Sequence, residues 1–385
     1  MYSIFDQDRY GYYLSSDNKK FYSKLECMLY CKDRNLDFAW HFNDQYYDQV
    51  NWSQEPARDI TDFYVERAQE LRQKYDYLVL HLSGGHDSGN ILETFMTNNI
   101  RLDEVITRGP YSGTNADPND RSVKNSFAEI ELCAVPIAKI AKEQYQPDLR
   151  ITVIETKQSS VDLWRQNKNW FELGYNDLDP GQFWRGEPHL IEPRYKQMTD
   201  QGKTVAHIYG TDKPTFYLQK HQLYLLFWDD TINRFNPYRN SHNDISFIEH
   251  FYWSPSTGGL LTKQAHLILN KLNCLDQSMT IASKLMMEGS SRLMQDWVAG
   301  IIYPNRFLPR WDTEKSHQPV FREWHHWFWS NTNSDFFLAW KKHMDYLNQT
   351  IPKKWLGKTN IYNGGYKRSR SKGYLIGNIK HDNII

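Results

Sequence analysis

The strongest constraint on the fold is a short apolar run that leads directly into a glycine-rich turn. Residues 77–82 (Tyr-Leu-Val-Leu-His-Leu) predict a buried strand, and Ser-Gly-Gly-His-Asp-Ser follows at positions 83–88. Residues 90–96 then predict a helix. A strand, a glycine-rich turn and a helix in this order are typical of open α/β sheets, in which ligands bind outside the carboxyl ends of the strands.

The same alternation continues along the chain. Further strands are predicted at 104–107, 150–155 and 204–209, and helices at 60–74, 127–142 (with a kink at Pro136) and 160–171. Strands that alternate with helices indicate a parallel sheet with right-handed crossovers. The pattern then changes to a predicted β-hairpin at 216–228 and, after about residue 245, to helices at 260–272, 279–289, 322–329 and 336–347.

The turn at positions 83–88 is suited to an anion. Gly84 and Gly85 let backbone N–H groups approach a ligand closely, and the positive end of the following helix points at the same place. Ser83 and Ser88 add hydroxyl donors. Asp87 would repel a phosphate, so we expect it to hold a Mg²⁺ ion that links it to phosphate oxygens. The alternative is an ordinary Gly-Gly turn with a capping side chain.

The loop resembles the Ser-Gly-Gly-x-Asp-Ser signature of the PP-loop (N-type) ATP pyrophosphatase superfamily. It matches neither the Walker phosphate loop nor the Gly-x-Gly-x-x-Gly dinucleotide motif. Members of the superfamily include asparagine synthetases, argininosuccinate synthetases, GMP synthetases and enzymes that modify tRNA or nucleobases. The resemblance implies cleavage of ATP to AMP and pyrophosphate with Mg²⁺. It also implies that the whole loop binds the nucleotide: Ser83, Gly84, Gly85, His86, Asp87 and Ser88.

A longer resemblance points to asparagine synthetase-like proteins of tailed bacteriophages that lack the glutaminase domain. Residues 11–14 and 20–27 look like the last hairpin and helix of that domain, and we predict a hairpin and a helix here. Further similar stretches lie at 253–255, 263–266 and 302–304. Position 2 is Tyr2, whereas the glutaminase nucleophile is a cysteine at that position, so we expect ammonia or another amine to be used directly.

The second motif of asparagine synthetases, Ser-Gly-Glu-Gly-Ser-Asp-Glu, is altered here. The strand at 204–209 leads into Gly210-Thr211-Asp212-Lys213-Pro214. The resemblance implies that Gly210 and Asp212 occupy the same corner, with Asp212 as a second Mg²⁺ ligand. Lys213 stands where a second acid is found in the family and could neutralise pyrophosphate. The alternative is a polar turn before Pro214.

Thr107 and Arg108 end the second predicted strand, where the resemblance implies contact with adenosine. We therefore include both in the expected nucleotide site. For Arg108 a solvated loop position is the alternative.

The composition excludes several classes of protein. Lys and Arg total 46 and Asp and Glu total 46, so the net charge gives no basic field for DNA or an anionic membrane. No apolar run reaches the roughly 20 residues of a membrane span, and the N-terminus lacks the pattern of a signal peptide. Four cysteines do not make a disulfide scaffold, which favours the cytoplasm (of the host, if phage-encoded). The basic stretch 366–374 is open to three interpretations: a lid, an RNA site or a solvated tail.

These observations predict an α/β protein with a parallel sheet of the PP-loop, adenine nucleotide α-hydrolase-like type. We divide the chain into an N-terminal extension (1–57), a PP-loop ATP-binding domain (58–244) and an α-rich C-terminal domain with a basic tail (245–385). The expected activity is that of an AMP-forming carbon–nitrogen ligase using ATP and Mg²⁺, with Asp87, Asp212 and Lys213 as catalytic residues. The alternatives are modification of a nucleobase or tRNA, and nucleotide binding without turnover.

Overall fold

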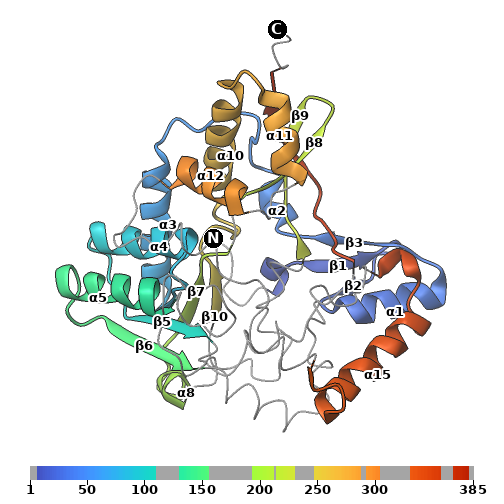
Figure 1. Cartoon of the computed structure of the whole chain (residues 1–385), viewed down its shortest axis with the longest axis horizontal. Coiled ribbons are helices and arrows are strands. Elements are labelled where there is room, and N and C mark those ends of the chain that lie inside the picture. The colour runs from blue at the N-terminus through green and yellow to red at the C-terminus, as the bar shows by residue number, and fades with distance from the viewer. Residues whose placement is uncertain are drawn as a thin grey trace.

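The centre of the molecule is a five-stranded parallel sheet with the order β10-β7-β4-β5-β6 (Figure 1). The computed structural model describes residues 7–109, 130–155, 193–211, 214–229, 247–287, 292–303, 330–356 and 367–380. The strands are β4 (Tyr77–His81), β5 (Glu104–Gly109), β6 (Arg150–Glu155), β7 (Val205–Tyr209) and β10 (Phe247–His250). The predicted α/β class with a parallel sheet is confirmed.

Helices cover both faces of this sheet, because its strands carry apolar side chains on both sides. Leu78 and Leu80 of β4 share a core with α3 (Ile60–Lys74), α4 (His86–Thr97) and α5 (Val135–Gln144). Val79, between them, faces the other way and packs with Tyr195 of α8 (Pro193–Asp200). The helix predicted over 127–142 is described from residue 130: a π-helical turn, Ile130–Ala134, runs into α5, and Pro136 lies in the first turn of α5.

The strand order creates a switch point beside β4. The chain runs outward from β4 through β5 to β6, and the next strand of the sheet, β7, then pairs with the opposite side of β4. Open α/β sheets bind their ligands outside the carboxyl ends of the strands that flank such a switch point, here β4 and β7. The loop at 83–88 follows β4, and Gly210 follows β7.

The N-terminal part forms a small antiparallel sheet beside the central one (Figure 1). Its elements are η1 (Gln7–Tyr10), β1 (Tyr12–Ser15), β2 (Lys20–Phe21), α1 (Lys24–Arg34), β3 (Phe38–His41) and α2 (Asp44–Tyr47). The predicted hairpin and helix are confirmed, and β3 adds a strand on the other side of β1. Helix α1 packs against α15 (Asp335–Thr350) through Met28 and Leu347.

The predicted hairpin after β7 is also confirmed, and the C-terminal part supplies it with a third strand. The hairpin strands β8 (Thr215–Gln219) and β9 (Gln222–Leu226) form the sheet β11-β9-β8 with β11 (Tyr374–Asn378). The remaining elements are α10 (Gly258–Asn273), α11 (Ser278–Met287), α12 (Arg292–Ile302) and η6 (Lys353–Trp355). None of the helices in the described ranges is long and apolar enough to cross a membrane.

The division into three parts remains a prediction. The fifth strand of the central sheet, β10, lies beyond the boundary proposed at residue 245, and one apolar core includes residues from all three parts. Helices predicted at 160–171 and 322–329 lie outside the described residues.

The described part of the basic stretch, residues 367–374, is built into the fold, so its interpretation as a solvated tail is wrong for these residues. The Ser369 backbone N–H donates to Asp229 Oδ1 (2.9 Å), and the Asp229 N–H donates to the Ser369 carbonyl (3.0 Å). Asp229 is fully buried and also pairs with Lys24 Nζ (2.6 Å) of α1. One carboxylate therefore joins the C-terminal segment to the N-terminal helix.

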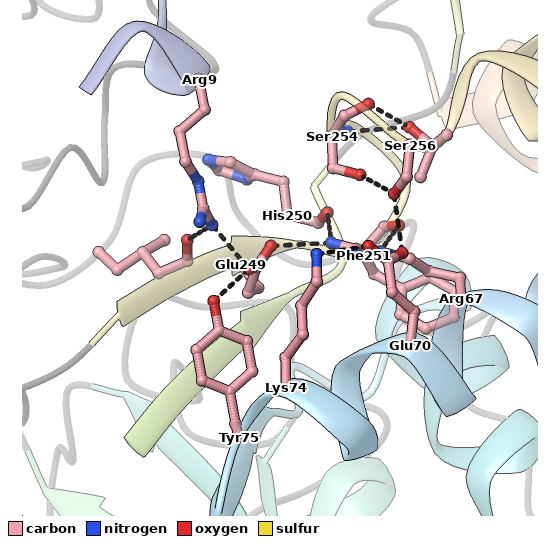
Figure 2. A network of polar contacts seen from close by, with 12 residues as sticks. Arg9, Arg67, Glu70, Lys74, Tyr75, Glu249, His250, Phe251, Ser254 and Ser256 are labelled. Atoms are coloured by element: carbon pink, nitrogen blue, oxygen red, sulfur yellow. Dashed lines mark hydrogen bonds and ion pairs between the residues drawn. The ribbon is translucent and has the colours of Figure 1, made fainter. Parts of the chain in front are cut away.

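A second buried ionic network fixes the edge strand β10 (Figure 2). Glu249 receives Arg9 on Oε1 (2.7 Å) and Arg67 of α3 on Oε2 (2.8 Å). The Tyr75 hydroxyl donates to the same carboxylate. Burial alone would raise the pKa of Glu249, but the two guanidinium groups outweigh it and hold the pKa at about 2. Glu249 is therefore ionised in the core, and it ties η1 and α3 to the sheet.

Candidate functional site

The glycine-rich loop lies at the switch point and opens α4. The strand β4 ends at His81, and Gly85 is the N-cap residue of α4 with an extended backbone. A glycine at this position has no side chain to bond the N–H groups of the first turn. These N–H groups and the positive end of the helix are therefore oriented toward the carboxyl edge of the sheet, where an anion can bind them.

The two serines of the loop have different surroundings. The Ser83 backbone N–H donates to Ser88 Oγ (3.1 Å), and the two hydroxyl oxygens lie 3.2 Å apart. The Gly85 N–H donates to Ser83 Oγ (3.3 Å). Ser83 is exposed, whereas Ser88 is buried. We conclude that Ser88 shapes the loop from within, and that Ser83 is the hydroxyl on the open side.

Gly84 is required by its backbone and by its neighbours. Its φ is +80°, a conformation that side chains disfavour, and an added Cβ would lie 3.1 Å from the Ala134 nitrogen. Cys133 Sγ donates to the Gly84 carbonyl (2.9 Å). Sequence patterns do not predict this contact, because Cys133 lies 49 residues further along the chain.

Gly210, at the end of β7, lies close to the first turn of α4. A Cβ at this position would lie 2.9 Å from the Ser88 nitrogen and 2.9 Å from Ile91 Cδ1. The end of β7 therefore touches the first turn of α4, and only a glycine fits between them. Asp212 and Lys213, the other predicted members of the second motif, lie outside the described residues.

This contact predicts that substitution by alanine changes stability differently at Gly210 and at Gly89. Gly210→Ala is expected to lower the free energy of unfolding by about 1–3 kcal/mol, because the new methyl group must displace α4. Gly89→Ala on α4 is the matched control, since a Cβ there meets nothing within 4 Å. Alanine favours helix, so we expect this control to be neutral or stabilising by up to about 1 kcal/mol. Denaturant unfolding measures both, and equal losses would contradict the proposed contact.

Thr107, in the second half of β5, is fully buried. Its Oγ1 has no hydrogen-bond partner among the described residues. An unpartnered buried hydroxyl is costly, so a ligand atom is a fitting partner for it. Arg108 follows in β5, and its side chain lies outside what the structure describes.

His86 and Asp87, in the first turn of α4, contact the C-terminal part of the chain. His86 Nε2 lies 3.2 Å from Asp296 Oδ1 of α12. The Tyr303 hydroxyl donates to Asp87 Oδ1 (2.5 Å), and the Tyr252 hydroxyl donates to the Asp87 carbonyl (2.8 Å). The sequence did not predict these contacts.

The side chains at the loop suit a hard cation, such as Mg²⁺, that is held mainly by the phosphate oxygens of a bound molecule. Within the described ranges, no group of three or more His, Cys, Asp or Glu side chains could hold a metal ion by itself. Asp87 supplies a carboxylate at the mouth of the anion site, where Mg²⁺ typically uses one or two carboxylates plus phosphate oxygens. The residues present therefore fit a Mg²⁺ ion that arrives with a polyphosphate.

The sheet order and the loop define an α/β protein with a glycine-rich helix N-terminus at its topological switch point. No family model matches the chain, and no curated protein matches it. Among solved structures it is similar to NAD+ synthetase from Burkholderia pseudomallei, with a TM-score of 0.29 and 10% identity. That match covers 80% of this chain and 96% of the other. The assignment to the α/β class rests on the sheet itself.

Proposed function

We propose that the chain is an ATP-dependent enzyme of the PP-loop type that forms AMP and pyrophosphate. One observation carries the proposal: the Ser-Gly-Gly-His-Asp-Ser loop lies at the carboxyl end of β4 and meets Gly210 at the switch point. This is where an open α/β sheet binds its ligand, and the loop offers N–H groups to phosphate.

The predicted residues have distinct roles in this reaction. Gly84, Gly85 and the first turn of α4 bind the departing pyrophosphate, and Ser83 donates from the open side. Mg²⁺, when bound, neutralises charge on the phosphates. Asp87 would hold that ion, with Asp212 as a second ligand. Lys213 would face the pyrophosphate, and Thr107 and Arg108 the adenosine.

The proposed acceptor is an acid or a carbonyl compound, as the resemblance to asparagine synthetases suggests. An oxygen of the acceptor attacks the α-phosphorus, and pyrophosphate leaves. An amine then attacks the activated carbon, a C–N bond forms, and AMP leaves with the loss of a proton from nitrogen. Ammonia or a free amine is the proposed source of the nitrogen. Binding energy serves mainly to align the reactants and to neutralise charge.

Product analysis tests this proposal. Pure protein is incubated with α-labelled ATP, Mg²⁺, ammonia and a panel of amino acids. We expect the label in AMP, and only with a particular acid. Label in ADP would overturn the proposed cleavage. ATP binding without turnover across acids, amines and RNA would identify a non-catalytic nucleotide-binding protein.

A second candidate, modification of a nucleobase in RNA, is favoured by the exposed cations of the folded C-terminal segment. The Arg368 guanidinium lies 4.6 Å from the centre of the Trp228 ring, and that of Arg370 lies 5.1 Å from the centre of the Tyr217 ring. Both arginines are exposed, so they can also reach phosphates. RNA binding that weakens steeply with salt, and weakens in Arg368→Gln with Arg370→Gln, would favour this candidate.

A further inference from the structure

Tyr303 connects α12 to the carboxylate of the loop. It directly follows α12, and its N–H donates to the Ala299 carbonyl (3.0 Å), so it continues the last turn of the helix. The side chain is 2% exposed, and its hydroxyl donates to Asp87 Oδ1. A phenylalanine would fill the same space, so packing alone does not explain why a hydroxyl is present.

Helix α12 contacts the start of α4 at two points. Asp296 and Tyr303 are seven residues apart, which is about two helical turns, so they lie on the same face of α12. They contact the consecutive residues His86 and Asp87. This arrangement fixes the orientation of both side chains at the mouth of the anion site.

Packed tyrosine rings hold the Tyr303 hydroxyl in place. The ring centres of Tyr303 and Tyr252 are 5.7 Å apart, and those of Tyr303 and Tyr64 are 6.3 Å apart. The Tyr252 hydroxyl accepts a hydrogen bond from Asn90 (3.1 Å) and donates to the Asp87 carbonyl. The Tyr64 hydroxyl donates to the Ile302 carbonyl (2.8 Å) and accepts from the Gln264 side-chain amide (3.0 Å), so it supports the cluster from behind.

The direction of the Tyr303–Asp87 hydrogen bond is fixed. The Tyr303 hydroxyl is the donor, and Asp87 Oδ1 accepts. Hydrogen bonds to a charged acceptor are stronger than those between neutral groups, so this bond selects one orientation of the carboxylate.

We propose that Tyr303 is a positioning residue that holds the Asp87 carboxylate in the orientation in which it takes the Mg²⁺ of the bound nucleotide. This inference rests on the proposed function and adds to it a residue that acts through Asp87. Helix α12 thereby contributes to nucleotide binding, which the sequence of the loop alone does not indicate.

The test is calorimetric binding of α,β-methylene-ATP, which cannot be cleaved between the α- and β-phosphates. Affinity is measured with saturating Mg²⁺ and with excess EDTA. Tyr303→Phe is expected to weaken binding about tenfold with Mg²⁺ and less than about twofold with EDTA, because only the metal-linked orientation of Asp87 is lost. Tyr64→Phe is the matched control: it removes another buried hydroxyl of the same cluster and is expected to leave the Mg²⁺ dependence unchanged. The EDTA measurement also shows that each variant is folded.

A second comparison separates positioning from packing. In an Asp87→Asn background, Tyr303→Phe is expected to cause no further loss of the Mg²⁺-dependent affinity, since the carboxylate is already gone. If the wild type shows no dependence on Mg²⁺ or on Asp87, the proposed function fails and the role of Tyr303 fails with it. If the wild type shows both, but Tyr303→Phe behaves like Tyr64→Phe, only the role of Tyr303 is overturned.

Discussion

Asp87→Asn is expected to slow AMP formation at least about a hundredfold, the largest catalytic effect that the site predicts. The change removes one negative charge from the first turn of α4, where the carboxylate would hold Mg²⁺ against the pyrophosphate. The amide oxygen of asparagine can still accept the hydrogen bond from Tyr303, so the fold should persist. The measurement is kcat/KM for AMP release, with the melting temperature recorded beside it.

Asp62→Asn provides the matched control for this prediction. Asp62 is an exposed acidic residue in the first turn of α3, so the substitution makes the same change of charge at the start of another helix. We expect less than a twofold effect on kcat/KM. If Asp87→Asn is also within about threefold of wild type, Asp87 is not the metal-holding group, and the proposed arrangement of the site is wrong.

The strands and the loop could be predicted because their signals are local. Residues 77–82 are apolar throughout and lead into two glycines, and β4, the loop and α4 follow this pattern. β10 was missed for a physical reason. Its four residues, Phe-Ile-Glu-His, include a buried glutamate that ion pairs with Arg9 and Arg67 make tolerable. Those arginines are distant in sequence, so neither hydrophobic periodicity nor composition reveals this strand.

The site shows the same division between local and distant signals. The sequence suggested that Gly210 meets the loop, and a Cβ at Gly210 would indeed collide with Ser88. The contact of Tyr303 with Asp87 was not predicted, since the spacing between two residues 216 positions apart carries no information about contact. β11 was not predicted either, because a solvated tail was one interpretation of the basic residues before it. The residues that hold this segment lie far upstream: Asp229 accepts from the Ser369 N–H, and the Phe227 N–H donates to Ser371 Oγ.

The largest expected effect on stability is that of Glu249→Gln, at about 3–5 kcal/mol near neutral pH. The change removes the negative charge with which the buried guanidinium of Arg9 pairs, and one of the two carboxylates that Arg67 binds. Glu66→Gln is the matched control, since Glu66 pairs with Arg58 (2.8 Å) in an exposed ion pair. Exposed pairs contribute little, so we expect a loss below about 1 kcal/mol. Equal losses in the two variants, measured by denaturant unfolding, would contradict a dominant role for the network.

The dependence on pH gives this prediction a second signature. The pKa of Glu249 is lowered in the folded protein to about 2, from its usual value of 4.5. A lowered pKa stabilises the fold above pH 4.5, and this contribution is lost as the pH falls from 4.5 toward 2. The shift corresponds to about 3 kcal/mol. Glu249→Gln has no group to titrate at this position, so its stability should fall less steeply than that of the wild type over the same range. Parallel curves for the two proteins would show that other carboxylates cause the acid sensitivity.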